Sequence, residues 1–449
     1  MIIKEGKILI DGRIFEGDIK IENGIISKID RFIGENGEEI IYANGRYVLP
    51  GLIDIHTHLD DTIGKYNIAD NFNSGSLIAA KNGITTLFNF ITERGDRPLN
   101  VAIKEFLRKG KDSSVNYGFH LTPINFGKKE IDYIKGLIDT GFKSFKFYTT
   151  YKNAGIYIDY EKMHNVVSAL KSEDTIFLVH AEDESILEKY YCYDYQTPFD
   201  HALYRPVEAE VEAVKKVIQI AKETDANFHI VHCSAVESAN LINASKKECK
   251  ITVESCPQYL VLNDELLKEN DGHRYFCTPP LRSSENSMEM QRLAREGKFD
   301  IFTTDHAPFI RRDKDENRER LRLVPNGLPG IGALAHIIYR IYTDDNKVNL
   351  SEFAKRLSEN PARIMNLFPQ KGAIKEGSDA DIIIFSECKE KKEISPTDRD
   401  VYNPYYNFTS NLRFDYVIIN GVLLIENGRV INNNFRGRCI NVNPEGIQE

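Results

Sequence analysis

The chain has 449 residues, a net charge of −9 at neutral pH, 41% hydrophobic residues and 28% charged residues. This length can hold one barrel-sized domain of about 250 residues with an accessory domain, and the composition excludes a disordered chain. Lysines and arginines are interspersed with acidic residues along the chain, which argues against a surface for nucleic acid.

The first residues and the cysteines indicate the compartment. The segment MIIKEGKILIDGRIFEGDIK alternates polar and apolar residues, unlike a signal-peptide core, and no apolar run approaches the roughly 18 residues of a membrane span. The seven cysteines are scattered and contain no Cys-x-x-Cys pair, so we interpret them as reduced thiols. We therefore expect a cytoplasmic protein without a membrane or nucleic-acid partner.

Both ends of the chain carry short alternating runs typical of β-strands. Residues 1–49 contain KILI and DIKIENGIISKI, with turn dipeptides at Asp11-Gly12, Asn23-Gly24 and Asn44-Gly45. Such dipeptides are strong hairpin signals. The same pattern of short alternating runs and turn dipeptides returns over residues 372–449, with ADIIIFS and a turn at Asn420-Gly421. We expect the two ends to form one small β-sandwich domain.

Between the ends, residues 50–371 alternate strand-like and helix-like patterns. Segments such as YEKMHNVVSALKSE and VEAEVEAVKKVIQIAKET have apolar residues at helical spacing. Eight such units predict an α/β fold with a (β/α)8 TIM-like barrel. The charged stretch RRDKDENRERLR is expected to be a solvated loop or helix on the barrel rim. The strand candidates are LIDIHTH, TTLFNF, YGFHL, SFKFY, TIFLVH, NFHIVH, KITVES and FDIFTTD.

Residues able to bind metal lie at the ends of these strand candidates. They are His56, His58, Lys146, His180, His232 and Asp305. Because parallel barrel strands present their carboxyl ends to one mouth, these side chains should converge there as a two-metal hydrolytic centre. In His-x-His, both imidazoles lie on one face of a strand. We interpret Asp305 as the one candidate carboxylate that closes a barrel strand. Four further histidines, His120, His164, His201 and His229, are expected to be core or surface residues.

Lys146 admits two interpretations at this point. A lysine in a barrel mouth usually pairs with an anion, but a neutral lysine can also add carbon dioxide and become a carbamate that binds two cations. Burial would favour the neutral amine. The spacing alone leaves both open.

The same residues carry a resemblance to a known family. LPGLIDIHTH resembles the first metal motif of the cyclic amidohydrolases, and within them of the dihydropyrimidinases and hydantoinases; SFKFYTTYKN resembles their segment with a carbamylated lysine and a substrate-contacting tyrosine. VHAED, IVHCS and TTDHAPF resemble the remaining ligand motifs, and ESCPQYL, TPPLR, VPNGLPG, NPARIMNLFPQKGAIKEGSDADIIIF and YNPYYN resemble segments outside the ligands.

The resemblance implies a metal-dependent hydrolase barrel and a set of roles. His56, His58 and Asp305 would bind the more buried of two divalent cations, expected to be zinc, and His180 and His232 the other, with carbamylated Lys146 between them. Asp305 and Tyr151 would be catalytic, while Tyr151, Thr278 and Asn326 would bind substrate. The implied reaction opens a dihydropyrimidine or hydantoin ring to an N-carbamoyl amino acid. The family also suggests a homo-oligomer, a tetramer or a dimer.

Some positions depart from this pattern and define the alternatives. Dihydroorotases, which VHAED and TDHAP also resemble, carry an arginine two residues after the second histidine, where this chain has Asp60. An acid there would repel an anionic ring, so we expect a neutral ring; an allantoinase or dihydroorotase-like enzyme is the alternative. A phosphotriesterase or deaminase would share the barrel but not TPPLR and NGLPG. A non-catalytic scaffold homologue is disfavoured because all six ligand positions are filled.

Overall fold

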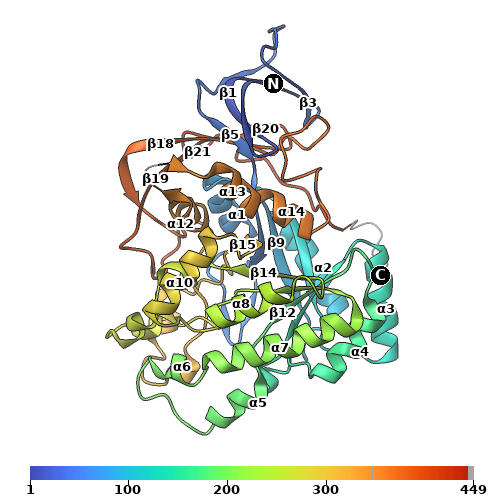
Figure 1. Cartoon of the computed structure of the whole chain (residues 1–449), viewed down its shortest axis with the longest axis vertical. Coiled ribbons are helices and arrows are strands. Elements are labelled where there is room, and N and C mark those ends of the chain that lie inside the picture. Colours follow the sequence, from blue (N-terminus) through green and yellow to red (C-terminus); the bar gives the residue numbers. More distant parts are fainter. Residues whose placement is uncertain (345–346, 443–449) are drawn as a thin grey trace.

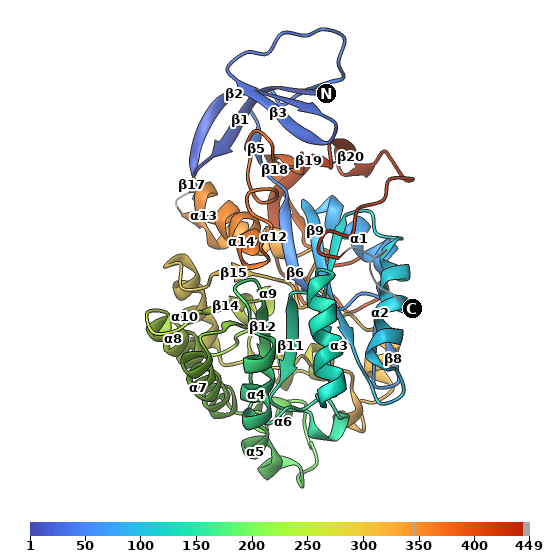
Figure 2. The ribbon, with the colours of Figure 1, turned by 90° about the vertical axis from the view of Figure 1, so that its right-hand side faces the viewer.

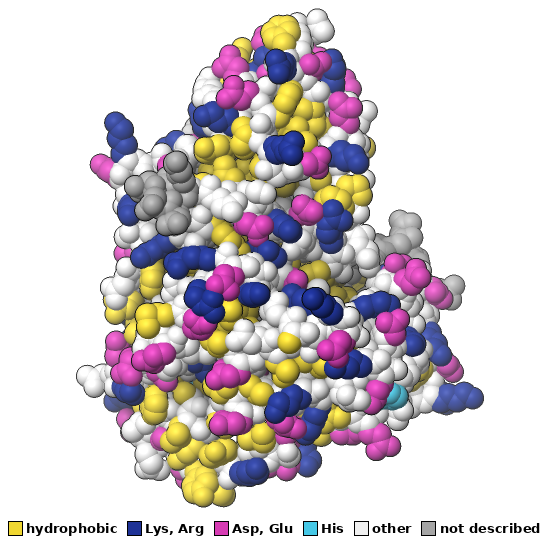
Figure 3. Space-filling view, viewed as in Figure 1, with side chains coloured by type: hydrophobic (Ala, Val, Ile, Leu, Met, Phe, Trp, Pro, Cys, Tyr) yellow, Lys and Arg dark blue, Asp and Glu magenta, His cyan; other side chains and the backbone are white. Residues whose placement is uncertain are grey.

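The computed structural model describes residues 1–344 and 347–442, which form a barrel and a small β-sheet domain at one end of it. The last seven residues of the predicted segment 372–449 lie outside this range. Of the described helices, none combines the length and the apolarity needed to cross a bilayer. On the face in Figure 3, basic and acidic side chains are intermingled, without a large region of one sign.

The barrel contains all eight predicted strands, parallel and in chain order. They are β6 (Leu52–Thr57), β9 (Ile84–Thr92), β10 (Asn116–Thr122), β11 (Ser144–Tyr148), β12 (Ile176–His180), β13 (Asn227–Ile230), β14 (Ile251–Ser255) and β15 (Ile301–Phe302). The β15 strand is short, and a parallel bridge between Thr57 and His306 joins the chain after it to β6. The sheet is thus nearly closed, and the predicted fold class is confirmed.

Helices cover the outside of the barrel strands (Figures 1 and 2). The long ones are α1 (Phe72–Lys81), α2 (Leu99–Gly110), α3 (Lys128–Asp139), α4 (Tyr160–Leu170), α7 (Val207–Thr224), α8 (Val236–Ser245), α10 (Ser284–Arg295) and α12 (Leu334–Ile341). The longest, α7, buries Ala213, Val217 and Ala221 at four-residue spacing, as an amphipathic crossover helix should. Short helices are α5 (Glu184–Leu187), α6 (Asp200–Leu203), α9 (Pro257–Val261), α11 (Arg311–Asp315), α13 (Leu350–Ala354) and α14 (Asn360–Ile364).

Strands from both chain ends join in one nine-stranded sheet, with a core of buried isoleucines separate from the barrel core. These strands are β1 (Ile2–Ile10), β2 (Arg13–Glu22), β3 (Ile25–Asp30), β4 (Ile40–Tyr42), β5 (Tyr47–Pro50), β18 (Ile382–Glu393), β19 (Thr409–Ile419), β20 (Val422–Glu426) and β21 (Arg429–Val430). Two two-stranded ribbons, β7 (Thr62–Ile63) with β8 (Tyr66–Asn67) and β16 (Thr343–Asp344) with β17 (Lys347–Val348), lie outside both sheets. The small domain from both termini is therefore present as expected.

Three of the four predicted turn dipeptides close hairpins of this sheet. At Asp11-Gly12, Asn23-Gly24 and Asn420-Gly421 both residues have positive φ, as a type I′ turn requires. The hairpin prediction is wrong at Asn44-Gly45, because the flanking strands β4 and β5 both pair in parallel with β1 instead of with each other. Asn44 and Gly45 do have the positive φ angles of such a turn, but the strands on either side of them do not pair with each other.

The two ends of the barrel differ. At the amino end, interior residues such as Ile53 and Ile301 pack against Ala362 of α14 and against Ile440. The carboxyl end lies opposite the small sheet, since α5 and α6, which follow β12, are farthest from it in both views (Figures 1 and 2). The site must therefore open at this end. The domain limits 1–49, 50–371 and 372–449 remain a prediction, although Ile440 itself packs on the barrel.

Candidate metal centre and active site

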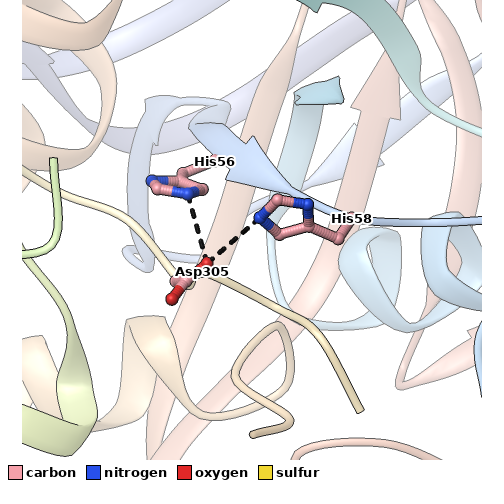
Figure 4. A group of neighbouring side chains, drawn as sticks. All are labelled: His56, His58 and Asp305. Atoms are coloured by element: carbon pink, nitrogen blue, oxygen red, sulfur yellow. Dashed lines mark ion pairs between the residues drawn. The ribbon is translucent and has the colours of Figure 1, made fainter. Parts of the chain in front are cut away.

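Three of the predicted ligands meet at the end of β6. His56 lies at the end of the strand and His58 just beyond it, and both rings point toward Asp305 (Figure 4). Asp305 Oδ1 lies 3.1 Å from His56 Nε2 and 3.3 Å from His58 Nε2. Ligand atoms of all three residues lie within 4.8 Å of one another. Burial would raise the pKa of Asp305, but the two imidazoles hold it well below its usual value.

The other two histidines form a second group beside the first. His180 ends β12 and His232 follows β13, with its backbone at φ +40°. His180 Nδ1 faces His232 Nε2 at 2.9 Å. The ring centres of His232 and His56 are 5.4 Å apart, so the two groups are contiguous.

Lys146 lies on β11 and is buried inside the barrel. Its Nζ is 4.9 Å from the ring centre of Phe90 and 5.2 Å from that of Tyr148. Among the described residues it takes part in no ion pair. Burial lowers its pKa to about 8, so about a tenth of the amine is uncharged at pH 7.

The donor atoms fit a divalent cation. His56 Nδ1 donates to Glu254 Oε1 at 2.5 Å, so in the neutral ring the lone pair of Nε2 faces the Asp305 carboxylate. That buried Nε2 has no hydrogen-bond partner, and neither has Nδ1 of His232. Burial would lower the pKa of His56, but Glu254 and Asp305 raise it, because the two carboxylates favour positive charge beside this ring, whether a proton or a cation carries it. Imidazole and carboxylate donors suit zinc-type ions.

Two buried glutamates that the sequence analysis did not select support the ligands. Glu254 lies on β14 and also accepts from His229 Nε2 at 2.9 Å and from the backbone N–H of His232 at 3.0 Å. Glu182 accepts from His180 Nε2 at 2.7 Å. Carboxylates of this kind orient metal-binding histidines. The view that Asp305 alone among the carboxylates closes a strand is thus wrong, because ITVES carries the same signal at Glu254. His229 is also more than a core residue, since it holds Glu254.

Of the three predicted substrate residues, Tyr151 lies beside this group and the other two lie on neighbouring segments. Tyr151, with φ +68°, precedes the 3-10 turn Lys152–Ala154, and its ring centre is 5.2 Å from that of His180. Thr278 and Asn326 lie on two neighbouring segments, because the carbonyl of Phe276 accepts from the backbone N–H of Gly327 at 2.8 Å. The structure therefore brings together the two segments expected to bind the ring.

Contrary to the prediction, the charged stretch RRDKDENRERLR on the rim is not wholly solvated. Lys314 in α11 is buried and its Nζ donates to the same carbonyl of Phe276 at 2.9 Å. Burial lowers its pKa to about 7. The stretch thus supports the segment that carries Thr278, because Lys314 binds the carbonyl of Phe276 two residues before it.

Asp60 does not have the role inferred from sequence. Its Oδ2 accepts the backbone N–H of Phe72, the first residue of α1, at 2.7 Å, which is a helix-start contact. The neighbouring Asp61 is buried and pairs with Arg94 at 2.8 Å. Arg97 contacts the same carboxylate at 3.6 Å. Because the Asp60 carboxylate is used in the contact with α1, it is not a reason to exclude an anionic ring.

The connection between β18 and β19, residues 394–408, reaches from the small domain to the mouth. Thr397 Oγ1 donates to Asp70 Oδ2 at 2.7 Å, and Arg399 Nε contacts Asp70 Oδ1 at 3.3 Å. Asp70 in turn accepts from Nε2 of His306, the residue after Asp305, at 3.1 Å. A segment assigned to the β-domain thus supports the loop that carries the candidate ligand Asp305.

A nearly closed parallel barrel with this donor set at its carboxyl end defines the class of metal-dependent barrel hydrolases. The model of the amidohydrolase family matches residues 47–424. The chain therefore belongs to the amidohydrolase family, as its motifs indicated.

Relatives and solved structures agree with this assignment. The chain is 32% identical over 416 residues to a D-hydantoinase of Geobacillus stearothermophilus, covering 90% of this chain and 88% of the relative. It is 31% identical over 394 residues to a D-hydantoinase of Ralstonia pickettii, with 86% of each chain covered. The dihydropyrimidinase structure from Brevibacillus agri superposes with a TM-score of 0.92 at 28% identity, covering 98% of both chains.

Proposed function

We propose that this chain opens dihydropyrimidine or hydantoin rings to N-carbamoyl amino acids with two divalent cations. The reaction class, hydrolysis of a cyclic amide bond, is confirmed by the family and by relatives that cover most of the chain. The proposed ring substrates are those given in the names of the relatives, hydantoins and dihydropyrimidines, and we extend them to this chain.

One observation carries the proposal. Four imidazoles and a carboxylate from four separate strand ends surround one buried lysine that has no counter-ion among the described residues. Such a group is costly to bury without a ligand. The carboxylates behind His56 and His180 fix their free nitrogens toward the centre, which favours cation binding over a structural role.

His56, His58 and Asp305 would hold one cation, and His180 and His232 the other, with zinc as the expected metal. A carbamate on Lys146 would supply the oxygen donors between the two groups. When bound, the two cations would lower the pKa of a water molecule and polarise the scissile carbonyl.

The remaining steps fall to this chain's residues. Asp305 would accept the proton of the attacking water and deliver it to the ring nitrogen as the C–N bond breaks. Tyr151 would donate its hydroxyl to the oxyanion that forms on the carbonyl. Backbone groups near Thr278 and Asn326 would orient the ring amide. The product keeps the carbamoyl group on its nitrogen and gains a carboxylate.

The quaternary and cellular setting belongs to the same proposal. We expect a homo-oligomer, tetramer or dimer, in the cytoplasm. On the face in Figure 3 basic and acidic side chains are intermingled, which argues against a nucleic-acid surface on that face.

The test is a turnover panel on one zinc-loaded preparation with measured metal content. Dihydrouracil and hydantoin should turn over with about two metals per chain and yield the N-carbamoyl products. Preference for allantoin would assign the chain to the allantoinases. Preference for dihydroorotate would assign it to the dihydroorotases, with Arg94 as the cation to test. No turnover of any ring by metal-loaded protein would refute the proposal.

A further inference from the structure

Arg205 lies between α6 and α7 and is almost fully buried, with 11% of its side chain exposed. Its guanidinium pairs with both oxygens of Glu182, from Nε to Oε1 at 3.0 Å and from Nη2 to Oε2 at 2.6 Å. Two-point pairs of this type fix the carboxylate in orientation as well as in charge. The arrangement therefore determines where the oxygens of Glu182 point.

One of these oxygens contacts a candidate metal ligand. Glu182 Oε2 accepts the hydrogen of His180 Nε2 at 2.7 Å. Because the carboxylate can only accept, this bond places the proton on Nε2 and leaves the lone pair of Nδ1 facing His232. Without Arg205, Glu182 would be a buried carboxylate with one imidazole partner and a less defined orientation.

The other face of the guanidinium covers Tyr151. The guanidinium carbon is 5.4 Å from the centre of the tyrosine ring, within the range of a cation–π contact. The same ring lies 5.2 Å from the ring of His180. Tyr151 has a left-handed backbone, at φ +68°, so its position depends on such contacts. Arg205, Glu182, His180 and Tyr151 thus form a closed cycle.

We propose that Arg205 is a positioning residue that couples the metal ligand His180 to the oxyanion donor Tyr151. This rests on the proposed function, since both partners act only if the chain binds metal and opens the ring. It assigns Arg205 no contact with substrate. The new element is that one side chain, Arg205, holds both His180 and Tyr151, the two residues whose partners are expected to stabilise the charge that develops on the carbonyl.

The control is Arg356, a buried arginine away from the mouth whose Nε and Nη2 both donate to a single oxygen of Glu352, at 3.0 and 2.8 Å. Arg205→Lys keeps the charge but cannot bind both oxygens of Glu182, whereas Arg356→Lys removes a contact with two donors elsewhere in the fold. Both variants are compared as zinc-loaded holoenzymes with Tyr151→Phe and with the double variant Arg205→Lys/Tyr151→Phe.

Arg205→Lys should release zinc to a chelator about 10–100-fold faster than wild type, the range for partners of metal-binding histidines. It should lower kcat by about tenfold or more with KM within threefold. Its effect on kcat should shrink in the Tyr151→Phe background, because the two residues act as a unit. Arg356→Lys should change none of these beyond twofold.

Two results would overturn the proposal: zinc release unchanged from wild type, or fully additive effects of Arg205→Lys and Tyr151→Phe on kcat. Failure of the proposed function looks different, since wild-type protein would then bind no zinc or open no ring. If Tyr151→Phe alone leaves kcat unchanged, the role of Tyr151 fails, and with it the coupling. If Arg205→Lys does not fold, Arg205→Gln with added guanidinium is tested instead, and lack of rescue of zinc retention counts against the proposal.

Discussion

Replacing Glu254 by glutamine is the most direct test of how the first ligand group is held. Its carboxylate accepts from His56, His229 and the backbone of His232. An amide has one acceptor oxygen, so one of these donors must face an NH2 group. A lost hydrogen bond to a charged partner costs about 1.5–3 kcal/mol, and loss of a carboxylate behind a metal-binding histidine costs about 10–100-fold in metal affinity.

We therefore expect Glu254→Gln to bind zinc about 10–100-fold more weakly and to unfold at a lower temperature. Zinc affinity is measured by competition with a chromophoric chelator, and stability by thermal unfolding of the metal-free protein. Glu93→Gln is the control, because Glu93 is also buried and accepts three N–H donors, but from Ile124 and Asn125. The control should lose stability and keep its zinc affinity. Equal zinc affinity in Glu254→Gln and wild type would refute the reasoning.

Four further predictions follow from the same geometry. Asp305→Asn can still offer an oxygen but carries no proton, so turnover should collapse, and activity within tenfold of wild type would assign proton transfer elsewhere. Tyr151→Phe should lower kcat by roughly 10²–10³, whereas a rise in KM alone would make Tyr151 a wall of the pocket. Lys146→Ala should lose bound metal and activity; an active enzyme with a free ammonium at Lys146 would disprove the carbamate. Burial would raise the pKa of Asp70, but His306 and the other donors to Asp70 lower it from 3.8 to about 2. About 2 kcal/mol of the free energy of unfolding should therefore be lost as the pH falls from about 4 to 2. Asp70→Asn should flatten the dependence of this free energy on pH in that range, and an unchanged dependence would contradict the prediction.

The barrel was predictable because its signals are local. Each strand is a short apolar run such as FLVH, and each candidate ligand stands at its end, where the geometry of parallel strands brings distant residues together. The helices α4 and α7 follow from apolar spacing alone. Turn dipeptides were equally reliable for backbone angles. They failed at Asn44-Gly45 because a dipeptide determines φ and not which strand pairs with which.

Contacts that depend on tertiary position were not predictable in this way. Asp60 was compared with a family position, yet only the fold shows that its carboxylate accepts the first N–H of α1. Thr397 reaches Asp70 across 327 residues of sequence. Glu254 did carry a usable signal, a carboxylate closing an apolar strand, and the same rule that selected Asp305 would have found it.

The balance of charge in the buried centre links the chemical state of Lys146 to the binding of the cations. The carboxylates of Asp305 and of the buried Glu182 and Glu254 stand against the guanidinium of Arg205 and the amine of Lys146. Two dications added to an ammonium at Lys146 would leave a large buried excess of positive charge, which is costly in a site that excludes water. A carbamate replaces that positive charge by a negative one and brings the centre close to neutrality. Carbamylation and the binding of two cations should therefore occur together, and metal-free protein should hold Lys146 as an amine.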